Sequence, residues 1–253
     1  MNTADELPLL EGHISRAFDG DLAALHLRVT TMGALVLNQV QAATLAYADW
    51  NAETAQLVTS REPQVNASER EVDQVSLQLI ARRQPMAHDL RAILSFERTV
   101  TDLERIGDEA NKIARLVMAG QSREGTGTDQ PGPSTAREVR QLGRLAAQLV
   151  RAAVEAFDAM DAVAAEIVIQ RDTELDEEYA AGLRRLLSRA MEDPRQLQGA
   201  VQSAFVLKSI ERIGDHARNV AQQVVELVGA ARAARAMQGT LTATVSPSSA
   251  TDR

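Results

Sequence analysis

The sequence predicts an all-α protein built as two tandem three-helix bundles related by internal duplication. Ala, Leu, Val, Arg, Glu and Gln dominate the composition, a set that as a whole favours helices over strands, and aromatic residues make up only 3% of it. Apolar residues recur at helical spacing over most of the 253 residues. One pattern occurs twice, as LERIGDEANKIA from Leu103 and as IERIGDHARNVA from Ile210. The repeat predicts two copies of one helical unit.

Six long amphipathic helices are expected in chain order. They cover residues 21–50, 52–83, 85–118, 136–160, 162–191 and 194–228. Pro63 is expected to kink the second helix or to introduce an irregular turn. Pro85 suits the first turn of the third helix, and Asp89 is favourable near its N-terminal dipole. Arg82 and Arg83 suit the C-terminus of the second helix, which favours cations.

The helices divide into two repeats with a linker between them. Residues 1–119 form the first repeat and residues 135–230 the second. The intervening residues 120–134 are rich in Gly, Pro, Ser and Thr and are expected to be a linker, because they cannot bury enough apolar surface to order themselves. Residues 231–253 are expected to be a disordered tail.

Alignment of the halves supports the duplication. With an offset of 107, residues 104–117 and 211–224 share eight identities in 14 positions. With an offset of 110, Glu62 and Asn66 fall on Asp172 and Asp176. The difference of three residues is absorbed in the turn between the second and third helix of each half.

Charge and composition exclude several classes of protein. The net charge of −8 and the pI near 5.1 predict repulsion of nucleic acid and of anionic lipid. The absence of cysteine excludes disulfides, thiolate metal sites and cysteine nucleophiles. The N-terminal residues lack the apolar segment of a secretion signal, and no apolar run approaches the length needed to span a bilayer. A soluble, cytoplasmic protein is expected.

One face of the third predicted helix carries a stripe of oxygen-bearing side chains beside its apolar stripe. The stripe consists of Glu97, Glu104, Asp108 and Asn111. Such ligands hold a divalent cation if other helices add more, and Asp172 and Asp176 are the natural additions. The alternative is a solvated helix border in which Arg105 and Arg212 form ordinary ion pairs. Lys208 shares a face with Glu211 and Asp215 and offers charge compensation without metal.

The duplicated glycines and the four histidines have simpler interpretations. A glycine inside a helix costs about 1 kcal/mol relative to alanine. Gly107 and Gly214 at equivalent places therefore indicate a close backbone approach, with a π-bulge or hinge as the alternative. The histidines, which are His13, His26, His88 and His216, fall into no ligand pattern. His216 is expected to be a surface or capping residue, and no hydrolase or phosphate-loop motif is present.

Several motifs in order resemble the PhoU family of bacterial phosphate-regulon regulators. They are RQPMAHDLR (83–91), DLERIGDEANKIA (102–114) and ERIGDHARNVA (211–221), joined by HISRAF (13–18), TMGALV (31–36) and MEDPRQL (191–197). The resemblance spans nearly the whole chain and implies two three-helix bundles in a pseudo-twofold arrangement.

The resemblance also implies a function. PhoU-like proteins are cytoplasmic adaptors between the ATPase subunit of the phosphate ABC transporter and a membrane histidine kinase. They keep the phosphate-starvation response off and restrain uptake when phosphate is plentiful. They are not regarded as enzymes, and they often form homodimers. The resemblance implies neither nucleic-acid binding nor direct membrane insertion.

Several members of the family bind iron, zinc or other cations through an Asp/Glu-x-x-x-Asp motif. The matching pairs here are Glu104 with Asp108, Glu211 with Asp215, and Asp172 with Asp176, whereas Glu62 with Asn66 breaks the pattern. The expected partner surface includes Arg105, Arg212, Glu97 and Asn111. A metal-binding or storage bundle, a metal-dependent enzyme and a purely structural scaffold are the alternatives to the adaptor.

Overall fold

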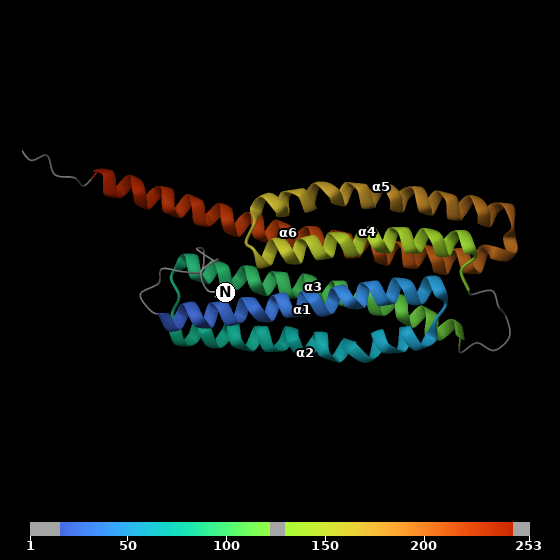
Figure 1. Ribbon diagram of the computed structural model, residues 1–253, viewed down its shortest axis with the longest axis horizontal. Helices are drawn as coiled ribbons and strands as arrows, with labels where there is room; N and C mark the ends of the chain where they lie inside the picture. Colours follow the sequence, from blue (N-terminus) through green and yellow to red (C-terminus); the bar gives the residue numbers. More distant parts are fainter. Residues whose placement is uncertain (1–15, 122–129, 245–253) are drawn as a thin grey trace, which may run out of the picture.

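A computed structural model describes residues 16–121 and 130–244, which fold entirely into helices and their connections (Figure 1). The helices are α1 (Arg16–Asp49), α2 (Ala52–Arg83), α3 (Ala87–Gln121), α4 (Pro133–Asp158), α5 (Ala162–Glu192) and α6 (Leu197–Thr244), with a short 3-10 turn η2 (Pro194–Gln196) before α6. The predicted all-α class and the six helices are confirmed. No helix in the described ranges is long and apolar enough to cross a membrane.

Most helix ends lie within a few residues of their predicted positions. Arg82 and Arg83 do occupy the last turn of α2, and Asp89 lies in the first turn of α3. Pro85 precedes α3 instead of starting it. Of the two outcomes expected at Pro63, a kink or an irregular turn, the irregular turn is absent, because α2 runs through Pro63 without interruption. Pro63 is exposed, so its ring lies on the solvent side of the helix.

The end of α6 differs most from the prediction. The helix continues to Thr244, whereas the sequence placed its end near residue 228 and treated residues 231–253 as a disordered tail. The extension contains the run AARAARAM, whose residues are all strong helix formers, so helical backbone propensity carries it on past the predicted end. Residues 245–253 of the predicted tail and residues 122–129 of the predicted linker lie outside the described ranges.

The helices form two three-helix bundles that lie side by side (Figure 1). In each half the three helices pack on one another, with α2 on the outside of the first bundle and α5 on the outside of the second. The two bundles meet where α1 packs on α4 and α3 packs on α6. One continuous cluster of buried apolar side chains therefore runs through both halves, and the repeats share a core.

Two reciprocal contacts between α1 and α4 reveal the pseudo-twofold relation. A Cβ atom built on Gly33 would lie 2.7 Å from a methyl group of Val154. A Cβ atom built on Gly143 would lie 2.7 Å from the Thr44 side chain. Adding 110 to 33 gives 143, and adding 110 to 44 gives 154, so each contact is the repeat of the other. This is the pattern of an isologous interface, made here within one chain.

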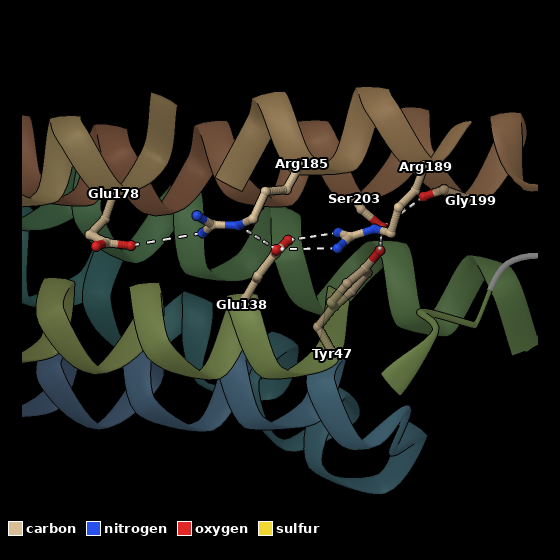
Figure 2. A network of polar contacts seen from close by, with 7 residues as sticks. All are labelled: Tyr47, Glu138, Glu178, Arg185, Arg189, Gly199 and Ser203. Atoms are coloured by element: carbon tan, nitrogen blue, oxygen red, sulfur yellow. Dashed lines mark hydrogen bonds and ion pairs between the residues drawn. The ribbon is translucent and has the colours of Figure 1, made fainter. Parts of the chain in front are cut away.

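A second pair of contacts follows the same relation. The Tyr47 hydroxyl lies 3.1 Å from the Ser203 Oγ, which in turn donates a hydrogen bond of 2.7 Å to the Gly199 carbonyl (Figure 2). The repeat equivalents of Tyr47 and Ser203 are Phe157 and Phe96, whose rings meet edge to face with centroids 5.3 Å apart. A polar contact at one end of the molecule thus corresponds to an aromatic contact at the other.

The connection between the first and second helix of each bundle is also duplicated. Trp50, directly after α1, and Met160, two residues after the end of α4, both have a positive φ, of 52° and 48°. The next residues, Asn51 and Asp161, cap α2 and α5 by accepting hydrogen bonds from backbone N–H groups of the first helical turn. Both positions coincide under the offset of 110, so the turn was inherited as a unit.

The glycine contacts give a stability prediction. We expect Gly33→Ala to lower the free energy of unfolding by about 1 to 3 kcal/mol, because its Cβ would clash with the stiff Val154 side chain. Gly20→Ala is the control, since nothing lies near a Cβ at that position, and it should be neutral or stabilising by up to about 1 kcal/mol. Urea denaturation measures both. If Val154→Ala does not restore part of the loss in the double variant, the clash is not the cause.

Candidate functional site

The carboxylates predicted in the second half gather on two adjacent helices. Asp172 and Asp176 come from α5, and Glu211 and Asp215 come from α6; these four residues are the second acidic cluster. At Gly214, α5 packs closely on α6: an added Cβ would lie 3.0 Å from the Asp172 Oδ1 and would clash with a Leu175 methyl group. The expected close approach at this glycine is therefore confirmed. Its consequence is that Asp172 is only 2% exposed.

The electrostatics of the second acidic cluster centre on Asp172. Burial raises the pKa of Asp172 to about 6, and repulsion by the other three carboxylates adds to the shift. Arg218 opposes it, with its Nε 3.4 Å from the Asp172 Oδ2. The Asp172 Oδ1 is buried and has no hydrogen-bond partner in the described part of the chain. A carboxylate held in this way destabilises the fold at neutral pH.

Lys208 neutralises the other end of the cluster, as the sequence suggested. Its Nζ donates a hydrogen bond of 2.7 Å to the Glu211 Oε1, and this bond raises the pKa of Lys208. The same ammonium lies over the Tyr179 ring at 5.5 Å from its centroid. The chain's own cations, Lys208 and Arg218, thus contact members of the second acidic cluster.

The first half has its own acidic cluster, and its composition differs from the expected one. Glu97, Glu104 and Asp108 of α3 are joined by Glu69 and Asp73 of α2; these five residues are the first acidic cluster. Burial raises the pKa of Glu104, with repulsion by Asp108 and Glu69 adding to it. Burial likewise raises the pKa of Glu97, and Asp73 and Glu69 reinforce the shift against the opposing effect of Ser76.

Glu69 and Asp73 are not among the residues predicted from the sequence, although a signal for them is present. They form a Glu-x-x-x-Asp pair in α2, seven residues after the Glu62 and Asn66 positions that the repeat alignment selected. Glu62 accepts a hydrogen bond of 2.9 Å from Arg115 instead. Gly107 of the first bundle approaches Gln39 and Val65, with 3.2 Å between an added Cβ and the Gln39 Oε1, so packing explains this glycine too.

Arg212 and His216, which the sequence also singled out, lie in the contact between α3 and α6. Arg212 pairs with the buried Glu109 of α3 at 3.2 Å. The His216 Nδ1 lies 2.8 Å from the Asp102 Oδ1, which also accepts a hydrogen bond from Asn219. The expectation that His216 is a surface or capping residue is therefore wrong. It bridges the repeats because α6 presents that side to α3.

The expected partner surface is only partly accessible. Asn111 is 3% exposed and is not available to a partner, because α3 packs against α1, α2 and α6 and keeps little free surface. Arg105 is exposed, and Glu97 is half-buried. Of the four residues named for this surface, Arg105 and Arg212 are exposed, and the role of the set remains a prediction.

A preformed metal site is not present among the described residues, since no three His, Asp or Glu side chains converge closely enough to hold an ion. The carboxylates are of the right chemical type for hard or borderline cations, but their side chains would have to move together. The assignment of Glu104, Asp108, Glu211, Asp215, Asp172 and Asp176 as metal ligands remains a prediction.

The two histidines whose side chains the structure describes, His26 and His216, belong to neither acidic cluster. The buried His26 stacks on Phe157 with centroids 5.1 Å apart, and its burial lowers its pKa. His13 and the side chain of His88 lie outside the described part of the structure.

Fold and site together define a class: a duplicated two-bundle protein with acidic residues between the outer and inner helices of each bundle. The family model of the PhoU domain matches the chain twice, at residues 29–117 and 139–224, once in each bundle. The chain belongs to the PhoU family. A homologue named as a phosphate-specific transport system accessory protein in Pseudomonas aeruginosa is 41% identical over 223 residues, which are 87% of this chain and 88% of the homologue.

Further comparisons agree. The protein named phosphate-specific transport system accessory protein PhoU in Escherichia coli K12 is 33% identical, over 84% of this chain and 86% of its own. The crystal structure of PhoU from Pseudomonas aeruginosa superposes with a TM-score of 0.78 at 39% identity, covering 84% of this chain and 99% of that one. PhoU from Streptococcus pneumoniae gives a TM-score of 0.73 at 26% identity, with coverages of 83% and 95%.

The state of Asp172 gives a pH prediction. Its pKa rises from 3.8 to about 6 on folding, so its contribution to stability is full below pH 3.8 and is lost as the pH rises through 6. We expect Asp172→Asn to remove this loss. The gain in free energy of unfolding over the unsubstituted protein should be larger at pH 8 than at pH 4 by about 2 to 3 kcal/mol. Urea denaturation across this range measures it.

The matched control is Glu177→Gln, an exposed carboxylate on the same helix. It should leave the pH profile of stability unchanged. If Asp172→Asn gives the same pH profile of stability as this control, burial does not disfavour the charged form of Asp172.

Proposed function

We propose that this chain is an accessory regulator of phosphate-specific transport. The observation that carries the proposal is the match of the PhoU domain model to both bundles, together with relatives of similar length that are named as accessory proteins of that system. Membership in a family of accessory and regulatory proteins also supports a role without catalysis.

In finer terms, the chain acts as a cytoplasmic adaptor between the ATPase subunit of a phosphate ABC transporter and a sensor histidine kinase. The long helices offer extended faces, on which a partner binds through a few anchoring side chains and a polar rim. To regulate, the chain has to bind one state of its partner better than the other, since equal affinity shifts no population. A homodimer would present two sets of such faces.

Loss of the protein tests the regulatory role. Deletion of its gene should switch on phosphate-starvation genes in phosphate-rich medium, and reporter fusions measure this. The tagged protein should retain the transporter ATPase and the kinase in pull-downs from phosphate-replete cells. Normal repression in the deletion strain would contradict the proposal.

The first acidic cluster is the proposed contact region of the adaptor. Glu104→Ala with Asp108→Ala should release repression and weaken pull-down of a partner, because these half-buried carboxylates remain partly accessible where α3 packs beside α2. Glu166→Ala with Glu177→Ala removes two exposed carboxylates from α5 and is the control. Equal repression by both variants in folded protein would make the cluster an ordinary solvated helix border.

A second candidate function is the binding of divalent, iron or zinc cations, favoured by the excess negative charge around Asp172. A cation drawn between Asp172, Asp176 and Asp215 would relieve the repulsion that raises the pKa of Asp172.

Elemental analysis of the purified protein tests this candidate. We expect metal in stoichiometric amount, reduced by Asp172→Asn with Asp215→Asn and unchanged by Glu177→Gln. Folded protein that carries no metal, even after dialysis against iron or zinc, would contradict it.

A further inference from the structure

A row of arginines runs along one face of α4 beside an open groove. The groove lies between α1 and α4 and has a volume of about 650 Å³. The arginines that line it are Arg137, Arg140, Arg144 and Arg151. Their spacing of three, four and seven residues places them on one side of the helix, over about 21 Å of its length. Four cations in one row stand out in a chain whose net charge is −8.

The row is poorly neutralised by the rest of the molecule. Arg140 pairs with Asp49, but Arg137, Arg144 and Arg151 have no ion pair or hydrogen bond within the described residues. The facing helix α1 has no acidic residue between Asp21 and Asp49. On α4 itself, Glu138 turns away toward α5, where Arg185 and Arg189 hold it at 2.8 and 2.9 Å (Figure 2).

The floor of the groove is apolar and close to the α1–α4 contact. Gly143 and Ala147 of α4 lie opposite Thr44 and Leu45 of α1. Leu45 is 50% exposed, although the cores on either side of it are closed. An exposed leucine beneath a row of cations matches a ligand that is apolar on one side and anionic along its edges.

The row belongs to one repeat only. Under the offset of 110, the four arginines correspond to Leu27, Thr30, Ala34 and Gln41 of α1, none of which is charged. The arginines are therefore not part of the packing that both repeats share. The duplicated core does not require them.

We propose that this groove, called here the arginine groove, docks an acidic amphipathic helix of a partner protein. Glutamate or aspartate side chains of the partner would accept hydrogen bonds from the guanidinium groups, and its leucine-type side chains would cover Leu45 and Ala147. The length of the row accommodates about four helical turns. A bare polyanion would leave the apolar floor exposed, so we infer a protein helix as the occupant. This inference stands apart from the proposed function and from the acidic clusters.

Binding of a designed probe tests the proposal. The probe is a fluorescein-labelled helical peptide of about four turns with a leucine stripe flanked by glutamates. Its affinity for the full chain is measured by fluorescence anisotropy at low and at physiological salt. Two further peptides replace the glutamates by lysines or the leucines by serines, and inorganic polyphosphate is the competing polyanion.

Charge reversal locates the binding surface. Arg137→Glu with Arg144→Glu and Arg151→Glu should weaken binding of the probe at least about tenfold. The matched control reverses Arg70, Arg184 and Arg232, which are exposed and lie outside the groove, with the same change in net charge. It should change the Kd by less than about twofold. Leu45→Ala should weaken binding without a change in charge.

Any of the following results would overturn the proposal. Equal losses in the two triple variants would mean that only net charge matters. Equal binding of the serine peptide, or displacement by polyphosphate at the same charge concentration, would make the groove a polyanion surface. Failure of the glutamate peptide to bind would exclude a helix of this chemistry. Circular dichroism verifies that each variant is folded.

Discussion

The close approach of α1 and α4 is the contact on which the arrangement of the two repeats depends. Gly33 and Gly143 each leave room for a side chain of the opposite helix, Val154 in one case and Thr44 in the other. Since backbone atoms come this near only where a side chain is missing, the two glycines set the spacing between the bundles. That spacing lets α3 meet α6, and one apolar interior then extends through both halves.

The acidic clusters place carboxylates at the edge of that interior, where they oppose its stability. Asp172 is almost fully buried beside three other carboxylates, and Glu97 and Glu104 are half-buried beside acids of α2. Packing alone would favour neutral side chains at such positions. Residues that oppose stability are commonly kept for binding or signalling, which is why these clusters are the candidate site.

The sequence predicted the six helices, the duplication and the packing role of Gly107 and Gly214, because helical periodicity and internal repeats are local signals. It could not tell which helix covers which face. Asn111 therefore looked like a surface residue, and His216 was expected at the surface, although α6 presents it to Asp102. Glu69 and Asp73 could not be predicted from the repeat, because the alignment of the halves places Glu62, and not Glu69, opposite Asp172. The length of α6 was underestimated because its extension carries no apolar stripe that requires burial.

The repeats have kept a common interior while their exteriors diverged. The first acidic cluster lies about two helical turns farther along its outer helix than the second, and the arginine row has no counterpart on α1. An ancestor assembled from two identical chains would have looked the same from both sides. Fusion and divergence made the surfaces of the two repeats different, so a ligand binds this molecule in only one orientation.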